Sequence, residues 1–232
     1  MWDGRYHGSV RARVEDGPVS GRIDKRRAIL DAAFAVFARL GYEKACVREI
    51  ADEAGVAKPT VYNHMTDKES LLREALVTAA DRVGADCLAA VERLRNPGAD
   101  LTAALEDTAR RLLRICAGDT SHALRRLSAA QANRLPDLVV LVRERTATAT
   151  LDALTDRLGL LALSGRLRIT DPAIAAEQFL ALLTGPLENR SAHGTRKVPP
   201  AELRAIATAA VRTFLAAYGT GADRPESPPG PR

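Results

Sequence analysis

Apolar residues recur at helical spacing along most of the chain. Between residues 23 and 39, for example, Ile29, Ala33, Val36 and Phe37 fall on one stripe of a helix. No alternating apolar and polar pattern, which would mark a β-strand, persists in the sequence. Aromatic residues make up only 4% of the chain, whereas Ala and Leu, the apolar residues with the highest helix propensity, are abundant. The sequence therefore predicts an all-α fold.

Glycine and proline residues divide this pattern into separate helices. Helices are expected at about residues 23–39, 47–54, 58–64, 68–95, 99–117, 120–133, 137–163, 171–187 and 200–218. Proline is tolerated in the first turn of a helix but not in its interior, so the prolines near residues 136, 172 and 200 mark helix starts. The two ends, residues 1–20 and 219–232, are polar or rich in Gly and Pro and are expected to be disordered.

Charge and cysteine content narrow the classes of partner. The formal net charge is +5, but residues 1–68 hold 12 Lys or Arg against 10 Asp or Glu. Contact with phosphate would therefore depend on the placement of a few groups. Three widely spaced cysteines without a CxxC motif predict a reduced cytoplasmic protein with no disulfide framework and no metal site. The longest strongly apolar run, residues 138–142, is too short to cross a bilayer, so no membrane partner is expected.

The stretch EIADEAGVAKPTVYNHMTDKESLL, Glu49–Leu72, holds three helical segments in close succession. The first ends at Gly55, which permits a sharp turn, the second begins at Lys58, and the third follows Asp67, a good N-terminal capping residue. Two short helices joined by a tight turn have the spacing of a helix-turn-helix.

The second of these segments has one inward and one outward face. At about 100° per residue, Val61 and Met65 fall on one narrow arc and are expected to face the core. Pro59 and Asn63 lie on the opposite side, with Thr60 and Tyr62 flanking them. Hydroxyl groups can bond phosphate oxygens, and an Asn amide can read the edge of an adenine. Pro59 or the Thr60 methyl can touch a thymine methyl.

Two lysines begin helices beside this face. Lys58 begins the second segment and Lys68 begins the third, and an ammonium group near exposed helix-start N–H groups suits a phosphate. The alternative is that residues 49–72 form a helical hairpin with a solvated face. A tyrosine on that face would then have no evident purpose, which favours insertion into the major groove of DNA.

Residues 26–76 resemble the DNA-binding domain of the TetR family of transcriptional repressors. The resemblance rests on IL-AA--VF---GY, V-EIA--AGV, VY-H and KE-LL, in the family's order and spacing. It implies a helix-turn-helix domain at residues 21–68 and an all-α domain at residues 69–218. The second domain would bind a small ligand and dimerise through its last two helices, so that a homodimer inserts its recognition helices into successive major grooves of a palindromic operator.

The resemblance also assigns roles by position. The implied DNA-binding residues are Arg48, Lys58, Pro59, Thr60, Tyr62, Asn63, His64 and Lys68. His64 lies at the flank of the recognition helix, where packing against the first helix is an equal alternative. Cys46 and Ala57 stand where the family usually has a capping Ser or Thr, which removes two hydroxyl groups that could contact phosphate.

The two implied functions of the second domain each have candidate residues. The expected ligand pocket lies among the helices of residues 78–165, with Cys87, Leu88, Val91, Leu105, Leu112, Ile115, Cys116, Leu127 and Leu141 as its lining. The expected dimer interface consists of Ile174, Phe179, Leu182, Leu183, Leu203, Ile206, Ala210, Val211 and Phe214. For both sets the alternative is packing in the core of one chain. We favour this alternative for each pocket residue taken alone, whereas we favour the dimer interface for the second set.

We therefore expect a ligand-responsive transcriptional repressor that binds a palindromic operator as a homodimer. A helical protein-interaction adaptor and a small-molecule-binding enzyme, neither acting on DNA, are the alternatives. The sequence contains no glycine-rich nucleotide motif, no HExxH and no nucleophile elbow, so we expect no enzymatic activity and no cofactor. The small-molecule effector is not identified by the sequence.

Overall fold

A computed structural model describes residues 18–192 and 194–220. The predictions for residues 1–17 and 221–232 lie outside the described residues. The described chain is helical, with α1 (Pro18–Leu40), α2 (Val47–Glu53), α3 (Lys58–His64), α4 (Lys68–Glu92), η1 (Arg93–Arg95), α5 (Leu101–Cys116), α6 (Asp119–Ala130), α7 (Pro136–Arg143), η2 (Glu144–Thr148), α8 (Ala149–Leu163), α9 (Pro172–Arg190) and α10 (Pro200–Tyr218).

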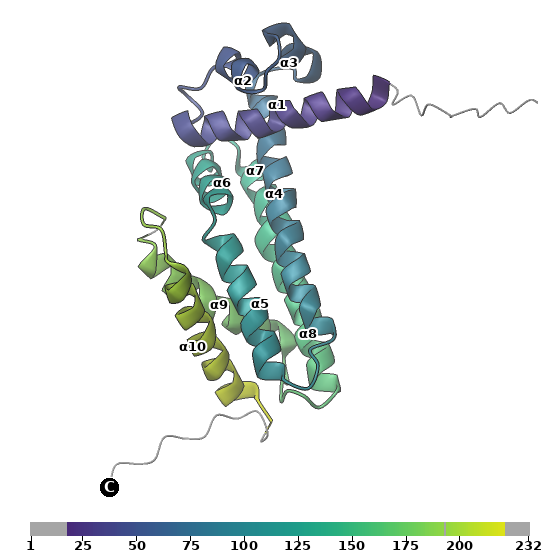
Figure 1. The fold of residues 1–232 in the computed structure, drawn as a ribbon, viewed down its shortest axis with the longest axis vertical. Coiled ribbons are helices and arrows are strands. Elements are labelled where there is room, and N and C mark those ends of the chain that lie inside the picture. The colour runs from purple at the N-terminus through teal and green to yellow at the C-terminus, as the bar shows by residue number, and fades with distance from the viewer. Residues whose placement is uncertain (1–17, 193, 221–232) are drawn as a thin grey trace, which may run out of the picture.

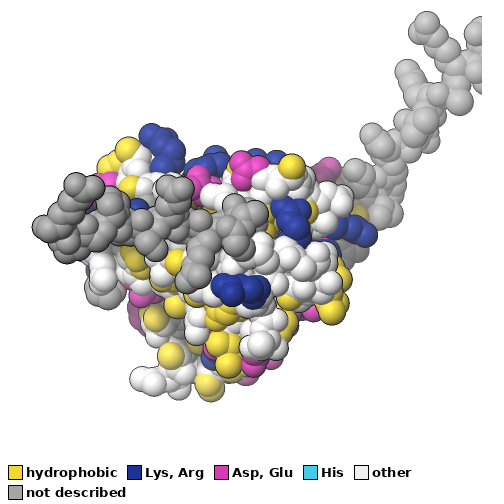
Figure 2. Space-filling model, turned by 90° about the horizontal axis from the view of Figure 1, so that it is seen from below, with side chains coloured by type: hydrophobic (Ala, Val, Ile, Leu, Met, Phe, Trp, Pro, Cys, Tyr) yellow, Lys and Arg dark blue, Asp and Glu magenta, His cyan; other side chains and the backbone are white. Residues whose placement is uncertain are grey.

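The helices form a small head on a long body. In Figure 1, α1 lies across the upper end of the body, α2 and α3 stand above it, and α4 runs from the head down the body. Helices α9 and α10 pack side by side, and α10 also packs against α5. Figure 2, seen from the lower end, shows basic, acidic and apolar side chains intermixed.

Two hydrophobic clusters stabilise the molecule. One lies in the head and includes Phe37, Ile50 and Leu72, each 0% exposed. The same cluster continues into the body through Leu124 on α6 and Leu138 on α7. A second cluster fills the body between α4, α5, α8, α9 and α10. Since burying one large apolar side chain contributes about 1.5–3 kcal/mol, the shared head cluster joins the head firmly to α6 and α7.

Helix boundaries depart from the sequence prediction in three places. Helix α1 begins at Pro18 rather than residue 23, so residues 18–20 belong to a helix and not to an arm; proline suits a first turn. The helix expected over 137–163 is divided by η2, one turn of π-helix. Helix α9 continues past Pro186 to Arg190, although the sequence predicted its end near 187.

The η2 turn packs against α4. A Cβ atom placed on Gly84 of α4 would lie 2.1 Å from the carbonyl oxygen of Arg145 in η2. Only glycine therefore permits this backbone approach.

The described residues were also searched for membrane-spanning helices and for groups of metal-binding side chains. No helix among residues 18–192 and 194–220 is long and apolar enough to cross a membrane. In the same part of the chain, His, Cys, Asp and Glu side chains do not gather in threes in a way that could hold a metal ion.

Candidate DNA-binding face and small-molecule cavity

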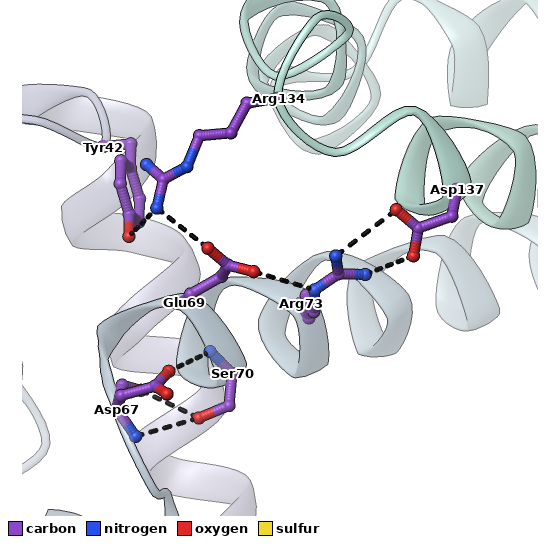
Figure 3. A network of polar contacts seen from close by, with 7 residues as sticks. All are labelled: Tyr42, Asp67, Glu69, Ser70, Arg73, Arg134 and Asp137. Atoms are coloured by element: carbon purple, nitrogen blue, oxygen red, sulfur yellow. Dashed lines mark hydrogen bonds and ion pairs between the residues drawn. The ribbon is translucent and has the colours of Figure 1, made fainter.

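The turn between α2 and α3 orients α3 relative to the head. Gly55 has a φ of +67°, a left-handed conformation that favours glycine. At the start of α2, the backbone N–H of Cys46 donates to the Glu49 carboxylate at 2.9 Å, which lowers the pKa of Glu49. At the start of α4, Asp67 and Ser70 cap each other reciprocally (Figure 3). The α2 start thus retains a cap contact although Cys46 replaces a hydroxyl residue.

Helix α3 is anchored by one face and exposed on the other. Val61 is 1% exposed and Met65 is 3% exposed, in agreement with the angular prediction. On the outer side Tyr62 is 49% exposed and Asn63 is also exposed. A helix held this way presents an aromatic phenol and an amide to a partner, which are groups that contact phosphates and base edges.

The other predicted DNA-binding residues surround this face. Arg48, Lys58 and Pro59 are exposed, and Thr60 and His64 are half-buried. The Lys58 ammonium lies 5.8 Å from the centre of the Tyr62 ring, so it stands next to the outer face of α3.

Lys68 has partners within the chain. Its ammonium lies 3.3 Å from the carbonyl oxygen of Glu43 and 4.5 Å from the centre of the Tyr42 ring. The side chain is half-buried. Lys68 therefore helps to hold the head together, in addition to any contact it makes outside.

A polar network joins the head to the body (Figure 3). Arg134, between α6 and α7, donates to the Tyr42 hydroxyl at 3.1 Å and to the Glu69 carboxylate at 2.9 Å. Glu69 also accepts from Arg73 at 3.5 Å, and Arg73 donates to Asp137 of α7 at 2.6 Å, which lowers the pKa of Asp137. The start of α4 is thus tied to the connection just before α7 and to α7 itself.

A mainly apolar cavity of about 450 Å³ lies in the body. Helices α4, α5, α6, α7, α8 and α9 and the η2 turn all contribute to its wall. Its lining comprises Val83, Cys87, Leu112, Leu113, Cys116, Ser121, Leu124, Arg125, Ser128, Ala129, Val139, Val142, Arg143, Thr146, Ala147, Thr150, Leu180, Leu183, Thr184, Leu187, Glu188 and Ser191. Its size falls in the range that holds drug-sized ligands.

Of the predicted pocket residues, Cys87, Leu112 and Cys116 line this cavity. The other six lie outside the lining of this cavity. Leu88 and Val91 border a separate shallow groove with α8, Leu105 is core, and Ile115 lines clefts on the outer side of α5. Leu127 belongs to the head cluster, and Leu141 is half-buried on α7 away from the cavity lining.

The cavity residues that sequence reasoning missed come mainly from α6, α7 and α9. Val139 and Val142 show an apolar spacing, but this spacing alone does not say which neighbour they face. Leu183 was assigned to the predicted dimer interface, and Leu187 was given no role by the sequence.

Most residues of the predicted dimer interface are buried within one chain. Within one chain, 0–6% exposure is found at Phe179, Leu183, Leu203, Ile206, Ala210, Val211 and Phe214. These side chains fill the body core, where Phe179 and Phe214 stack edge to face at 5.1 Å, so they cannot form a surface between two chains. Leu182 is half-buried, and Ile174 is 50% exposed.

Comparison with known proteins gives the same fold and the same two parts. Residues 29–75 match the model for bacterial regulatory proteins of the tetR family, and residues 103–220 match the model for the C-terminal domain of AefR-like transcriptional repressors. A putative TetR-family transcriptional regulator from Mesorhizobium loti has a similar solved structure, with 33% identity, a TM-score of 0.79, and coverage of 86% of this chain and 98% of that one.

Two further proteins are similar over different lengths. The flavonoid-responsive regulator FrrA is 27% identical with a TM-score of 0.64, over 85% of this chain and 98% of that one. The transcriptional repressor KstR2 of Rhodococcus jostii is 40% identical over 57 residues, which is 25% of this chain and 28% of that curated relative. The alignment thus spans little more than a quarter of the curated relative. From the matches that extend along the whole body, the chain belongs to the TetR family of bacterial transcriptional regulators.

Proposed function

We propose that the protein is a ligand-responsive transcriptional repressor that binds a palindromic operator as a homodimer. The observation that carries the proposal is the outer face of α3, where Tyr62 and Asn63 are exposed while Val61 and Met65 hold the helix in place. A solvent-exposed helix face that carries an amide and a phenol fits the major groove, which admits one α-helix. The site of action is the cytoplasm, where bacterial DNA lies.

Each exposed group has a proposed DNA contact. The Asn63 amide reads a base edge, with adenine preferred by its paired donor and acceptor. The hydroxyl groups of Thr60 and Tyr62 bond phosphate oxygens. Pro59 or the Thr60 methyl touches a thymine methyl. Backbone phosphates are bound by the basic side chains around this face. These are Arg48, Lys58, His64 and Lys68.

The homodimer is proposed to form through the outer face of α9 and α10. This face carries exposed small side chains, among them Ala181 and Gly185 on α9 and Ala205, Ala209 and Ala216 on α10. Small side chains let helices approach closely. Two copies related by a two-fold axis would present two α3 helices, which must lie about 34 Å apart to read successive major grooves.

The ligand response is proposed to begin in the body cavity. Helices α6 and α7 form part of its wall, and Arg134 and Asp137 tie those helices to the start of α4. A ligand that favours another spacing of α6 and α7 would shift α4 and the head, so that the two α3 helices no longer fit one duplex. FrrA is a flavonoid-responsive regulator and KstR2 is a repressor, which supports a small-molecule response and repression for this chain.

Fluorescence anisotropy tests the proposal with DNA from upstream of the chain's own gene. We expect that duplex to bind about 10³-fold or more tightly than a scrambled duplex at the same salt concentration. Equal binding of both duplexes at physiological salt, or a monomer that saturates one half-site alone, would contradict the proposal.

A further inference from the structure

The hydroxyl groups in the cavity wall are mostly occupied by the chain itself. Thr146 donates to the carbonyl oxygen of Val142 at 2.8 Å, and Thr150 donates to that of Thr146 at 2.7 Å. Ser121 donates to the carbonyl oxygen of Ile115 at 2.7 Å. A ligand would have to break these bonds to use the hydroxyl hydrogens, so these residues are poor donors for it.

Ser128 differs from these residues. It is only 6% exposed and lines the cavity from α6. Its Oγ atom is buried and has no hydrogen-bond partner among the residues that the structure describes. A buried hydroxyl without a partner destabilises a protein, because its hydrogen bonds to water are lost and not replaced. The Ser128 side chain would have to turn toward the cavity for a ligand oxygen to restore that bond.

The interior of the cavity is electrically neutral. Cys87 and Cys116 both line it, and burial raises the pKa of both thiols, that of Cys87 to about 12. They are therefore protonated at neutral pH and supply no charge.

The charged residues bordering the cavity are exposed and of both signs. They are Arg125, Arg143 and Glu188. Arg125 already donates to the carbonyl oxygen of Cys116 and contacts His122 Nδ1, each at 3.0 Å. An ionised ligand group moved into the apolar interior would lose its hydration without gaining a buried counter-charge.

We propose that the cavity binds an uncharged, mainly apolar molecule of drug size carrying a hydroxyl or carbonyl oxygen, and that Ser128 bonds this oxygen. The proposal rests on the ligand-responsive function above and adds the chemical class of the effector. Apolar walls with a few well-placed polar groups are the usual means by which a pocket orients a ligand.

Displacement of N-phenyl-1-naphthylamine, a neutral fluorescent probe, tests the class with three matched competitors at pH 7. Naphthalene has no polar group, 1-naphthol has a neutral hydroxyl, and 1-naphthoate has a charge. We expect 1-naphthol to bind about 2- to 10-fold more tightly than naphthalene, the range of one net hydrogen bond, and 1-naphthoate to bind most weakly.

Two serine variants locate the effect. Ser128→Ala should abolish the advantage of 1-naphthol over naphthalene and should raise the melting temperature of the ligand-free protein, since an unpaired buried hydroxyl is removed. Ser164→Ala is the matched control, because that serine ends α8 outside the cavity lining and donates to Leu161. It should leave the preference unchanged.

Several results would overturn the ligand class. They are no binding of the probe, tighter binding of 1-naphthoate than of 1-naphthol, and an unchanged preference in Ser128→Ala. Anisotropy of the same wild-type sample with operator DNA separates the two proposals. Retained DNA binding with any of these results rejects the ligand class alone, whereas failure to prefer operator DNA rejects the proposed function.

Discussion

Two lysines at the head begin helices but have different surroundings. Lys58 begins α3 and is exposed, and its ammonium group lies 5.8 Å from the centre of the Tyr62 ring. Lys68 begins α4 and is half-buried against Glu43 and Tyr42. Sequence alone gave both the same phosphate-binding role, because a helix start is visible in a sequence whereas the neighbours of a side chain are not.

Lysine-to-alanine variants should separate these surroundings. Lys58→Ala should weaken binding to operator and random DNA by the same factor, and should lower the slope of log affinity against log salt by about one. Lys68→Ala should also lower the melting temperature, because it removes a cation–π contact worth about 0.5–1 kcal/mol. Salt-dependent anisotropy and thermal denaturation measure both effects. An unchanged salt slope for Lys58→Ala would exclude its phosphate contact.

Helical periodicity predicted where helices lie, but it did not predict an interruption inside one of them. The bounds of α3 and α10 agree with the sequence prediction, because proline and glycine mark their ends clearly. The π-turn η2 could not be predicted, since it depends on a contact between Gly84 and Arg145, 61 residues later in the chain. This turn separates α7 from α8 within the stretch that the sequence predicted as one continuous helix.

Gly84→Ala should destabilise the protein through this contact. The new Cβ would collide with a backbone oxygen, and overpacking of this kind costs about 1–3 kcal/mol or more. Gly159→Ala in α8 is the matched control, because its Cβ would meet only Pro172 Cγ at 3.6 Å. The control should stabilise by up to about 1 kcal/mol through helix propensity. Equal unfolding free energies for the two variants in urea would show that α4 and η2 are not in tight contact.

The network around Arg134 should transmit ligand binding to the head. Arg134→Gln removes the charged bridge between Tyr42 and Glu69. Without ligand, the variant should bind DNA about as tightly as the wild type. A saturating effector or cavity probe should weaken DNA binding by the variant less than by the wild type, by a factor of about 5 or more, which is the lower range of typical coupling energies. Arg95→Gln in η1 is the matched control, because Arg95 is exposed, pairs with Glu92 at 3.1 Å, and lies outside both the cavity lining and the proposed dimer face. Full coupling in Arg134→Gln would exclude this route.

At the scale of the molecule, the sequence predicted a two-part all-α protein but misassigned its surfaces. The apolar stripes of α9 and α10 were found correctly, yet periodicity cannot say whether a stripe packs within a chain or between chains. Phe179 and Phe214 pack against each other within one chain. The face left for a partner carries alanine and glycine, which give weak hydrophobic signals. For the same reason only three of the nine predicted pocket residues reached the cavity.

Charge placed on the outer face of α10 should separate the protomers. Ala209→Arg puts a bulky cation where we propose close helix contact, and should shift the mass in analytical ultracentrifugation from dimer to monomer. Ala89→Arg adds the same charge to the exposed side of α4 and should remain dimeric. Phe214→Ala should instead lower the free energy of unfolding by about 3–5 kcal/mol, as expected for a core residue. A dimer that survives Ala209→Arg would place the interface elsewhere.

The most direct test selects bound duplexes from random DNA with the wild type and with Asn63→Ala in parallel. We predict a palindromic motif for the wild type, with half-site centres about 10 base pairs or a multiple of that apart. Asn63→Ala should lose information at one base pair in each half-site, symmetrically, while the rest of the motif remains. A wild type that enriches no motif, or an Asn63→Ala motif identical to that of the wild type, would contradict a reading role for the outer face of α3.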